Sequence, residues 1–400
     1  MIIHSKHVYT SQGVKDVNLI IEGKKIKGII PADGKADKDY GELRIIPGII
    51  DTHNHGTLGY SMANKDPDFP KQIKGYVKGL VSQGVTGILA TCGEPSLYPD
   101  LVNAIREDYL GAKIIGIHSE GPYLNRVGEK AVDLGHPDID LKYLENMVKQ
   151  GQGHLKLVGI APELPKAKEA ITYLLSQGVK VAFTHSDCNY DQAKEAFRWG
   201  ISVTTHTANV MSGIHHRHMG GLGACLLDQN VNNEIICDLL HVNKEMLEIM
   251  FKCKPYSKFL MVSDNVPLAG GPQGTYTMEL DPGEKLICTI DWQGYCLTET
   301  GRLFGSTKPV MFGIKNLVTK LDIPLEKVLE MSSLNPARLY GYGDSKGSIE
   351  ANKDADLVII DDNYEVLQTY REGRIVYDHK IDTDLFNPEF LKQAHFLPAK

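Results

Sequence analysis

The 400-residue sequence lacks the features that mark nucleic-acid-binding and membrane proteins. It has no dense block of Lys and Arg, and its formal net charge is -7, which argues against nucleic acid or an anionic membrane as the main partner. No apolar run approaches the ~18 residues of a membrane span, and the N-terminal residues lack the sustained apolar core of a signal peptide. We therefore expect a soluble, cytoplasmic protein that binds neither nucleic acid nor a membrane.

Cysteine is also scarce, with seven dispersed residues and no Cys-x-x-Cys pair. Such a set is unlike a disulfide framework or a structural zinc site, so we interpret most of these residues as small buried apolar side chains. Cys188 follows His185 at a distance of three positions and is a weaker candidate for a soft metal ligand.

The middle of the chain alternates short apolar runs with longer segments of helical periodicity, which is typical of βα units. Eight such runs occur, at residues 49–50, 86–90, 114–117, 155–160, 179–183, 201–203, 234–237 and 259–262. Eight is the strand number of a (β/α)8 barrel, which takes about 250 residues. The sequence therefore predicts the α/β class, with a TIM-like catalytic barrel over residues 47–344.

Both ends of the chain carry strand signals instead. Residues 17–21 and 25–30 flank a glycine turn, and a second hairpin pattern at residues 369–377 follows an apolar segment at 356–360. We expect residues 1–46 and 345–400 to form one small β-sandwich domain from both termini.

Five of the apolar segments run directly into a histidine or a carboxylate. The side chains at these ends are His53, His55, Glu120, His185, His206 and Asp264. In a parallel barrel the C-terminal ends of the strands converge on one face, so these side chains can surround one site. Imidazole and carboxylate groups bind divalent metals, and their repeated placement at predicted strand ends indicates a metal-dependent enzyme.

The spacing of these residues indicates how the site is built. His53 and His55 lie on one face of a strand, because side chains alternate with a period of two. Glu120 is the carboxylate placed to bridge two ions, because the fourth predicted strand ends without the lysine that some hydrolases of this architecture carboxylate instead. His118 and Asp51 are better candidates for hydrogen-bond partners of the ligands than for ligands.

Asp264 is the strongest candidate for the acid/base residue. A carboxylate beside a metal-activated water can accept its proton and later pass it to a leaving amine. The alternative is a structural aspartate in the turn Ser263-Asp264-Asn265, and the position at a strand end favours catalysis.

With these residues in place, the chain resembles the N-acetylglucosamine-6-phosphate deacetylases, a branch of the amidohydrolase superfamily. The similarity covers nearly the whole chain and rests on a series of motifs in a characteristic order. They lie at residues 47–56, 118–123, 161–163, 205–211, 215–217, 238–242, 262–264, 305–307, 335–338 and 347–357.

The resemblance implies that Glu120, His185 and His206 hold the main metal and that Asp264 is the general acid/base. Some members of the family lack the histidine pair of the first strand and use one ion. Because this chain has the pair, the resemblance implies one or two divalent ions, with zinc or iron expected.

The resemblance also implies the substrate contacts. Asn209, the backbone of Val210 and His241 would contact the sugar of a phosphorylated amino sugar. Arg217, next to His216, would grip the 6-phosphate, and the chain would form a homodimer with this contact across its interface. For Asn209 and His241, a turn asparagine and a satisfied loop histidine are the structural alternatives.

Two segments depart from the family pattern, and both lie in the substrate-binding region. Residues 206–211 read His-Thr-Ala-Asn-Val-Met where the family usually has His-Leu-Phe/Tyr-Asn-Ala-Met, and residues 217–220 read Arg-His-Met-Gly instead of Arg-Glu-Pro-Gly. N-acetylgalactosamine 6-phosphate or another N-acylated amino sugar is therefore an alternative substrate. The missing lysine disfavours a cyclic amidase or a deaminase, and the retained ligands disfavour a non-enzymatic binding or assembly protein.

The expected reaction is hydrolysis of N-acetylglucosamine 6-phosphate to glucosamine 6-phosphate and acetate, a step of amino sugar metabolism. A glycine-rich segment at residues 268–303 either closes over the substrate or packs as a β excursion, and packing is expected.

Overall fold

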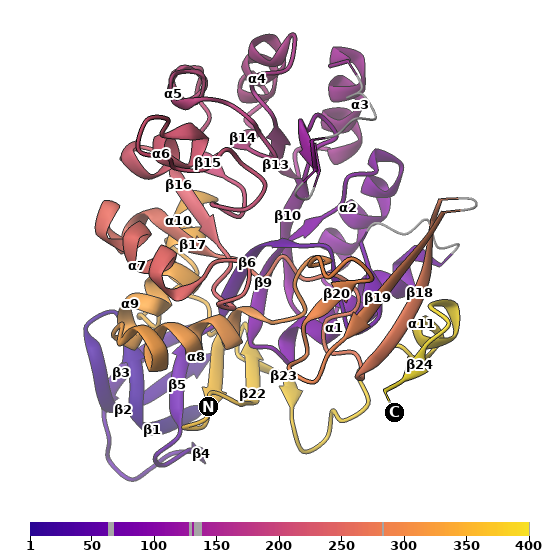
Figure 1. Cartoon of the computed structure of the whole chain (residues 1–400). Helices are drawn as coiled ribbons and strands as arrows, with labels where there is room; N and C mark the ends of the chain where they lie inside the picture. The colour runs from indigo at the N-terminus through magenta and orange to yellow at the C-terminus, as the bar shows by residue number, and fades with distance from the viewer. Residues whose placement is uncertain (63–67, 128–129, 132–137, 282–283, 400) are drawn as a thin grey trace.

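The computed structural model describes residues 1–62, 68–127, 130–131, 138–281 and 284–399. At its centre is a parallel sheet in the order β6-β9-β10-β13-β14-β15-β16-β17 (Figure 1). These strands span Ile49–Asn54, Val85–Thr91, Lys113–Ser119, Leu155–Ile160, Lys180–Phe183, Val203–Thr204, Asn232–Ile235 and Phe259–Met261. Each strand overlaps one of the apolar runs in the sequence, and the predicted TIM-like barrel is confirmed.

The barrel closes through residues just beyond its first and last strands. The Asp264 N–H donates a hydrogen bond to the His53 carbonyl oxygen at 2.9 Å, and Asn54 forms a parallel bridge with Asn265. Closure therefore brings the end of β6 against the end of β17, where two of the predicted ligand segments lie.

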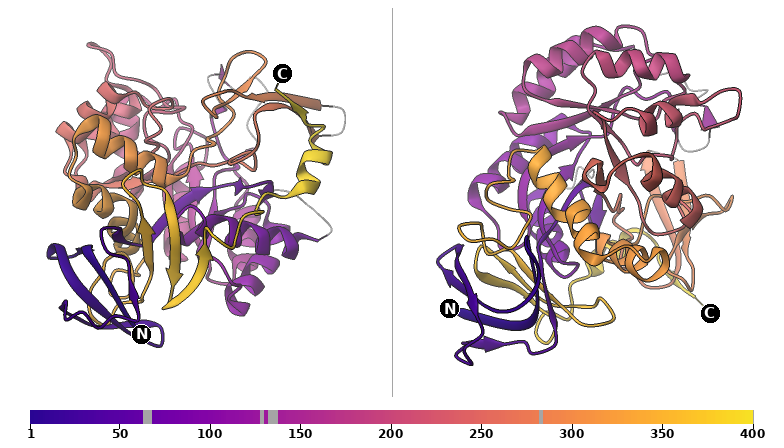
Figure 2. Two further views of the ribbon diagram at one scale, coloured as in Figure 1. Left: turned by 90° about the horizontal axis from the view of Figure 1, so that it is seen from below. Right: turned by 90° about the vertical axis from the view of Figure 1, so that its left-hand side faces the viewer.

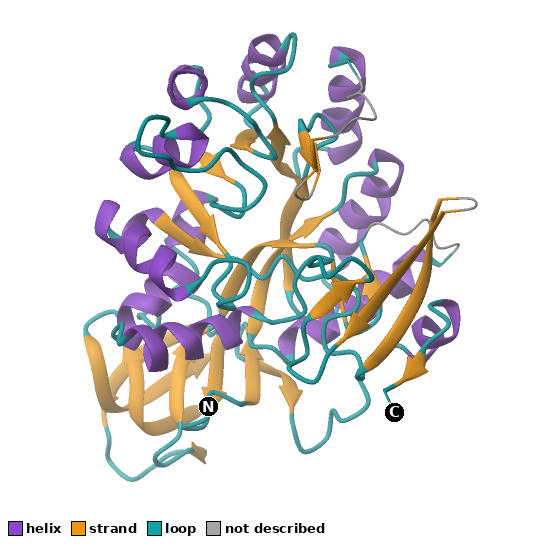
Figure 3. Ribbon diagram, viewed as in Figure 1, coloured by secondary structure: helices purple, strands orange, loops and turns teal. Residues whose placement is uncertain are grey.

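Helices cover the outside of the barrel strands (Figure 3). They are α1 (Phe69–Val81), α2 (Tyr98–Glu107), α3 (Leu141–Gly151), α4 (Ala167–Ser176), α5 (Tyr190–Arg198), α6 (Gly220–Leu227), α7 (Lys244–Cys253) and α8 (Val310–Leu321). In α1, Asp68 caps the N-terminus by accepting a hydrogen bond from the Lys71 N–H, and Gly84 follows the helix with a φ of +80°, a backbone conformation that glycine adopts readily after a helix. Within the described ranges, no helix has the length and apolar character to cross a membrane.

Part of the barrel interior is filled by a layer of aliphatic side chains. Seven strands contribute one residue each: Ile50, Leu89, Ile115, Leu157, Ala182, Val203 and Leu260. Ala337 of α10 (Asn335–Leu339) joins this layer, and the Asn335 side chain donates to the Phe259 carbonyl oxygen at 2.9 Å. Helix α10 follows α9 (Leu325–Leu329) and a π-helical turn, η3 (Glu330–Leu334), and it closes the N-terminal end of the barrel.

A second sheet combines the two ends of the chain in the order β3-β2-β1-β5-β21-β22-β23, with β4 paired to β1. Its strands are β1 (Ile2–Thr10), β2 (Gly13–Glu22), β3 (Lys25–Pro31), β4 (Lys38–Asp39), β5 (Arg44–Pro47), β21 (Leu357–Ile360), β22 (Val366–Arg371) and β23 (Arg374–Asp378). Both expected hairpins are present, with Glu22 opposite Lys25 and Arg371 opposite Arg374. The domain boundaries at residues 46/47 and 344/345 stay a prediction.

The two hairpin turns of this terminal sheet meet. Lys24 forms an ion pair with Glu372 at 2.6 Å, and the Ala355 N–H donates to the Lys24 carbonyl oxygen at 2.8 Å. The sheet therefore curls over its own buried core, in which Leu19 of β2 and Leu357 of β21 are fully buried.

A third sheet follows β17 and contains β18 (Gly274–Asp281), β19 (Glu284–Ile290), β20 (Cys296–Thr298) and β24 (Leu397–Pro398). The segment at residues 268–303 thus forms a β excursion, apart from residues 282–283, which lie outside the described residues. The chain end leaves the terminal sheet: β24 pairs with β18, and α11 (Pro388–Gln393) precedes it (Figure 2). The ring of Tyr276 packs 4.9 Å from that of Phe396, which anchors the chain end at this sheet rather than in the sheet assigned to it from the sequence.

Short hairpins and turns complete the described fold. They are β7 (Gly56–Thr57) with β8 (Tyr60–Ser61), β11 (Arg126–Val127) with β12 (Lys130–Ala131), and the 3₁₀ turns η1 (Pro95–Leu97) and η2 (Tyr256–Lys258).

Candidate metal centre

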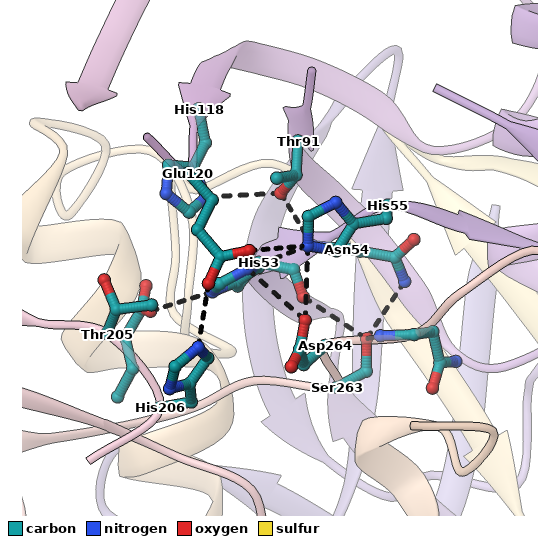
Figure 4. A network of polar contacts seen from close by, with 12 residues as sticks. His53, Asn54, His55, Thr91, His118, Glu120, Thr205, His206, Ser263 and Asp264 are labelled. Carbon is teal, nitrogen blue, oxygen red and sulfur yellow. Dashed lines mark hydrogen bonds and ion pairs between the residues drawn. The ribbon is translucent and has the colours of Figure 1, made fainter. Parts of the chain in front are cut away.

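The predicted metal ligands lie together at the C-terminal end of the barrel strands, and all of them except His185 are labelled in Figure 4. They are His53 and His55 at the end of β6, Glu120 after β10, His185 after β14, His206 after β15 and Asp264 after β17. Their donor atoms form two groups that share Glu120. The structure thus brings all six side chains together, and their coordination of an ion stays a prediction.

The first group has three donors: Oε1 of Glu120 and Nε2 of His185 and His206. The carboxylate oxygen lies 3.0 Å from His185 and 2.8 Å from His206, and the two nitrogens are 3.2 Å apart. A tetrahedral ion with bonds of ~2.0–2.1 Å has ligands separated by roughly 3.3 Å. This three-donor group therefore fits one face of a tetrahedral site and leaves a fourth position for a reactant, as catalytic zinc sites do.

The second group has four donors: Nε2 of His53 and His55, Oε2 of Glu120 and Oδ1 of Asp264. The two nitrogens are 3.2 Å apart, and Asp264 lies 3.3 Å from each. Oε2 of Glu120 lies 3.1 Å from His55 and 3.5 Å from His53. This four-donor group also fits a tetrahedral ion, so Asp264 is placed as a metal donor in addition to its predicted acid/base role.

Glu120 turns one oxygen to each group, as its position in the sequence predicted for a bridging carboxylate. Burial acts to raise the pKa of Glu120, but His53, His185 and His206 together hold this pKa well below its usual range. Glu120 is therefore an anion, as a bridge between two cations would require, and its bridging role stays a prediction.

Three of the six donor residues have a left-handed backbone. The φ angles are +42° at His185, +27° at His206 and +51° at Asp264, a region that costs free energy for residues other than glycine. The turn at His206 is held by the next residue, since the Thr207 N–H donates to the Glu234 carbonyl oxygen at 2.7 Å. Tertiary contacts thus enforce the backbone that turns these side chains toward one another.

Asp51 connects the first strand to the turn that carries Asp264. It accepts hydrogen bonds from the Ser263 hydroxyl at 2.5 Å, from the Ser263 N–H at 3.2 Å and from the His53 N–H at 3.3 Å. Burial raises the pKa of Asp51 to about 6, against the lowering effect of these bonds. Asp51 therefore positions His53, and Asp264 through its neighbour Ser263, by hydrogen bonds, as the sequence suggested. It belongs to neither donor group.

His118 also lies beside the donors without joining either group. Its ring packs edge-on against His53 with centroids 4.5 Å apart, and its Nδ1 lies 3.2 Å from the Thr91 hydroxyl. Burial and the neighbouring His53 hold the pKa of His118 well below its usual value, so this ring is neutral. Its contact with the centre is ring packing on His53 rather than the predicted hydrogen bond to a ligand.

Two carboxylates near the site, the buried Glu234 and the partly buried Glu163, were given no role from the sequence, although Glu163 lies in the motif at residues 161–163. Glu234 of β16 has Oε2 3.3 Å from Nδ1 of His53, and Glu163 accepts hydrogen bonds from the side chains of Asn125 and Ser186, both at 2.7 Å. Glu234 opens an apolar run that was recognised only as a strand. The one available signal was a charge at the start of the otherwise apolar run 234–237.

Cys188 belongs to neither donor group. Its thiol lies 3.3 Å from Glu163, and burial raises its pKa. A protonated thiol does not ligate a metal, which agrees with the interpretation of this cysteine as a buried apolar residue.

The predicted sugar contacts lie on loops next to the centre. The Asn209 side chain donates to the His206 carbonyl oxygen at 3.1 Å, and Val210 follows with a φ of +50°. His241 donates from Nδ1 to Asp238 at 2.6 Å. Burial acts to lower the pKa of His241, but Asp238 and Asp264 raise it overall, so Asp264 is close enough to act on this ring.

The predicted phosphate-binding residues are more distant. His216 and Arg217 are exposed on a hairpin closed by two hydrogen bonds of 2.9 Å between the backbones of His215 and His218. Within the described residues, no contact joins these two side chains to the donor groups.

Metal binding at this centre is expected to release protons. Burial acts to lower the pKa of His55, but Asp264 and Glu120 raise it from 6.5 to about 9 in the metal-free site. The bound proton stabilises the metal-free fold below pH 6.5, and this contribution is lost as the pH rises through about 9. A cation must displace this proton, so metal affinity should increase with pH across the same window.

Adding Zn²⁺ to the chelator-treated protein at pH 8, in weak buffer with an indicator dye, should therefore acidify the solution. A His55→Asn variant should release fewer protons. Equal release from both proteins would contradict the assignment of His55 as a proton-bearing donor.

The chain is similar to known proteins over most of its length. The model of the Amidohydrolase family matches residues 44–376. A deacetylase of N-acetylglucosamine 6-phosphate from Vibrio furnissii is 30% identical over 371 residues, which cover 89% of this chain and 90% of the relative. A deacetylase of N-acetylgalactosamine 6-phosphate from Escherichia coli O157:H7 is 28% identical, with 94% of this chain and 98% of the relative covered.

A solved structure gives the same result. It is a mutant N-acetyl-D-glucosamine-6-phosphate deacetylase from Mycobacterium smegmatis in complex with N-acetyl-D-glucosamine-6-phosphate. It superposes with a TM-score of 0.84 at 26% identity, and 94% of this chain and 99% of that chain are covered.

Proposed function

Since this chain belongs to the amidohydrolase family, we propose that it hydrolyses N-acetylglucosamine 6-phosphate to glucosamine 6-phosphate and acetate. The observation that carries the proposal is the three-donor group with an open fourth position, in a chain similar to deacetylases over most of its length. A divalent ion in this group, zinc or iron, would supply the Lewis acidity that activates a water molecule and polarises the acetamide carbonyl. A phosphorylated substrate also fits the cytoplasmic location expected from the sequence.

Asp264 performs the proton transfers in this proposal. Burial acts to raise its pKa, but His53 and His55 lower it to about 2, so its carboxylate is ionised and free to accept a proton. Asp264 then delivers that proton to the nitrogen of the substrate. This step is required because an amine is a poor leaving group until it is protonated.

His241 and Asn209 orient the sugar in this proposal. Because Asp238 occupies Nδ1 of His241, the Nε2 atom is the one left to contact the substrate. Asn209 is tied to the carbonyl of His206 through its Nδ2, which leaves its side-chain oxygen as a hydrogen-bond acceptor for a sugar hydroxyl.

The phosphate contact gives a direct test. Arg217→Ala should raise KM for the phosphorylated substrate by about tenfold to a hundredfold, because a charged hydrogen bond contributes about 1.5–3 kcal/mol. KM for unphosphorylated N-acetylglucosamine should not change. Arg198→Ala is the matched control, because Arg198 is an exposed arginine on α5 whose one ion pair among the described residues is with Glu195. An equal rise in KM for both substrates would show that Arg217 does not bind the phosphate.

If Arg217 acts across a homodimer interface, as the resemblance implies, mixing should restore activity. An Arg217→Ala chain combined with an Asp264→Asn chain would form some sites with both native residues. Recovery of deacetylation in the mixture, measured against each variant alone, tests the shared site.

N-acetylgalactosamine 6-phosphate is the second candidate substrate, because the Escherichia coli relative is named for it at 28% identity. Acetate release should be measured from both phosphorylated sugars and from their unphosphorylated forms, with metal content determined on the same sample. The proposal predicts the highest kcat/KM for N-acetylglucosamine 6-phosphate. Activity on none of the four sugars by the metal-loaded protein would refute it.

A further inference from the structure

A single carboxylate interrupts the aliphatic layer inside the barrel. Seven strands place one aliphatic residue in this layer, and the eighth strand, β16, contributes none to it. In β16, Glu234 pairs in register with Leu260 of β17, and Leu260 belongs to the layer. Paired residues of adjacent parallel strands point to the same face, so Glu234 points into the barrel.

Glu234 is completely buried, and a buried carboxylate is costly unless its oxygens are satisfied. Oε1 accepts a hydrogen bond from the Thr52 hydroxyl at 2.9 Å, and Oε2 lies 3.3 Å from Nδ1 of His53. No Lys or Arg pairs with Glu234 among the ion pairs of the described residues. The side chain thus serves two neighbouring residues of β6, one of which is a donor of the four-donor group.

We propose that Glu234 is a positioning residue that fixes His53 as a metal donor and thereby sets the occupancy of the four-donor group. When Nδ1–H of His53 donates to Glu234, the ring is held in the tautomer whose Nε2 carries the free lone pair. That Nε2 is the atom facing His55 and Asp264, at 3.2 and 3.3 Å. The inference rests on the proposed function in one respect, because it takes the four-donor group as a metal site.

The main chain of Glu234 reaches the other group as well. Its carbonyl oxygen accepts the Thr207 N–H at 2.7 Å, directly after His206. A side-chain substitution leaves this bond intact. The three-donor group should therefore keep its ion when the Glu234 carboxylate is removed.

Two variants test the proposal in the full-length chain. Glu234→Gln keeps the shape and removes the charge, and Glu234→Leu supplies the aliphatic residue that the other seven strands place in the layer. Zn²⁺ would be titrated into the chelator-treated proteins in competition with a chromophoric chelator. Native protein should bind two ions, and both variants should bind one ion as before and the second about tenfold to a hundredfold more weakly.

Thermal unfolding of the metal-free proteins separates positioning from a structural role. Glutamine has the shape of Glu234 and keeps an oxygen that can accept from the Thr52 hydroxyl or from Nδ1–H of His53, so metal-free Glu234→Gln should have a Tm close to the native value. Glu234→Leu leaves both buried groups without their acceptor and should have a lower Tm. Thr52→Val is the matched control, because it removes the other hydrogen bond of Glu234 and leaves the contact with His53. Its second ion should bind as in the native protein.

Excess metal provides the rescue. Raising free Zn²⁺ by about a hundredfold should refill the second site in Glu234→Gln, as expected when the substitution weakens affinity without destroying the donors. Unchanged binding of the second ion in both variants would overturn the proposal, as would a lower Tm of metal-free Glu234→Gln with loss of both ions.

The outcomes for this proposal and for the proposed function are distinguishable. If native protein binds one Zn²⁺ and still releases acetate, the positioning proposal fails and the deacetylase proposal stands. If Glu234→Gln loses only the second ion while native protein deacetylates none of the sugars, the positioning proposal stands and the substrate assignment fails.

Discussion

Glu120→Gln should leave the protein without a stable ion at either group and lower acetate release by at least about 10⁴-fold. One oxygen of Glu120 lies 2.8–3.0 Å from the nitrogens of His185 and His206, and the other lies 3.1 Å from His55. Glutamine offers one oxygen, and its NH₂ group has no lone pair available to bind a cation. The substitution therefore removes the oxygen that serves one group and replaces the anionic oxygen of the other group by a weaker, neutral one.

Metal content by elemental analysis and acetate release measure this effect on the same sample. Glu169→Gln, on the exposed face of α4, is the matched control and should change neither quantity. If Glu120→Gln retained two tightly bound ions, the carboxylate would not be the bridge between the groups.

Asp264→Asn should lower kcat by about 10²–10⁴-fold with a smaller change in KM, which is the usual effect of losing a general acid/base residue. The amide cannot take the proton of the attacking water. It also cannot protonate the amine that leaves. The three-donor group does not include Asp264, so one ion should remain bound.

The pH profile distinguishes this role from a purely structural one. The acidic limb of kcat/KM should be lost from the residual activity of Asp264→Asn, because that limb reports protonation of the base. Asp191→Asn, at the exposed start of α5, serves as the control. Turnover near the native level in Asp264→Asn would contradict the mechanism.

The sequence predicted the barrel and its donors because both follow from one geometric rule. Parallel strands in a barrel end on the same face, so residues such as His185 and Asp264 can be placed together once the strand ends are located. The short strand β15 shows the limit of this reasoning, since only Val203 of the expected run 201–203 lies within it. The position of His206 nevertheless followed, because it depends on where the strand ends and not on its length.

Features that depend on tertiary contacts could not be predicted. The assignment of Asp264 to the four-donor group requires the closure of β17 against β6, which periodicity does not encode. Glu234 looked like an ordinary strand residue until its register with Leu260 placed it inside the barrel. The pairing of β24 with β18 joins segments far apart in the sequence, and a strand of two residues carries no periodic signal.

The terminal sheet constrains how the polypeptide is completed during synthesis. Strand β5 ends at Pro47, but its neighbour β21 starts only at Leu357. The ribosome must therefore synthesise the whole barrel before β21 can pair with the edge of β5. Throughout this interval, the unpaired edge of β5 in the nascent chain is exposed to adventitious strand addition. Translational stalling before residue 357 should therefore yield an aggregation-prone product, even though the catalytic segments up to Asp264 are already present.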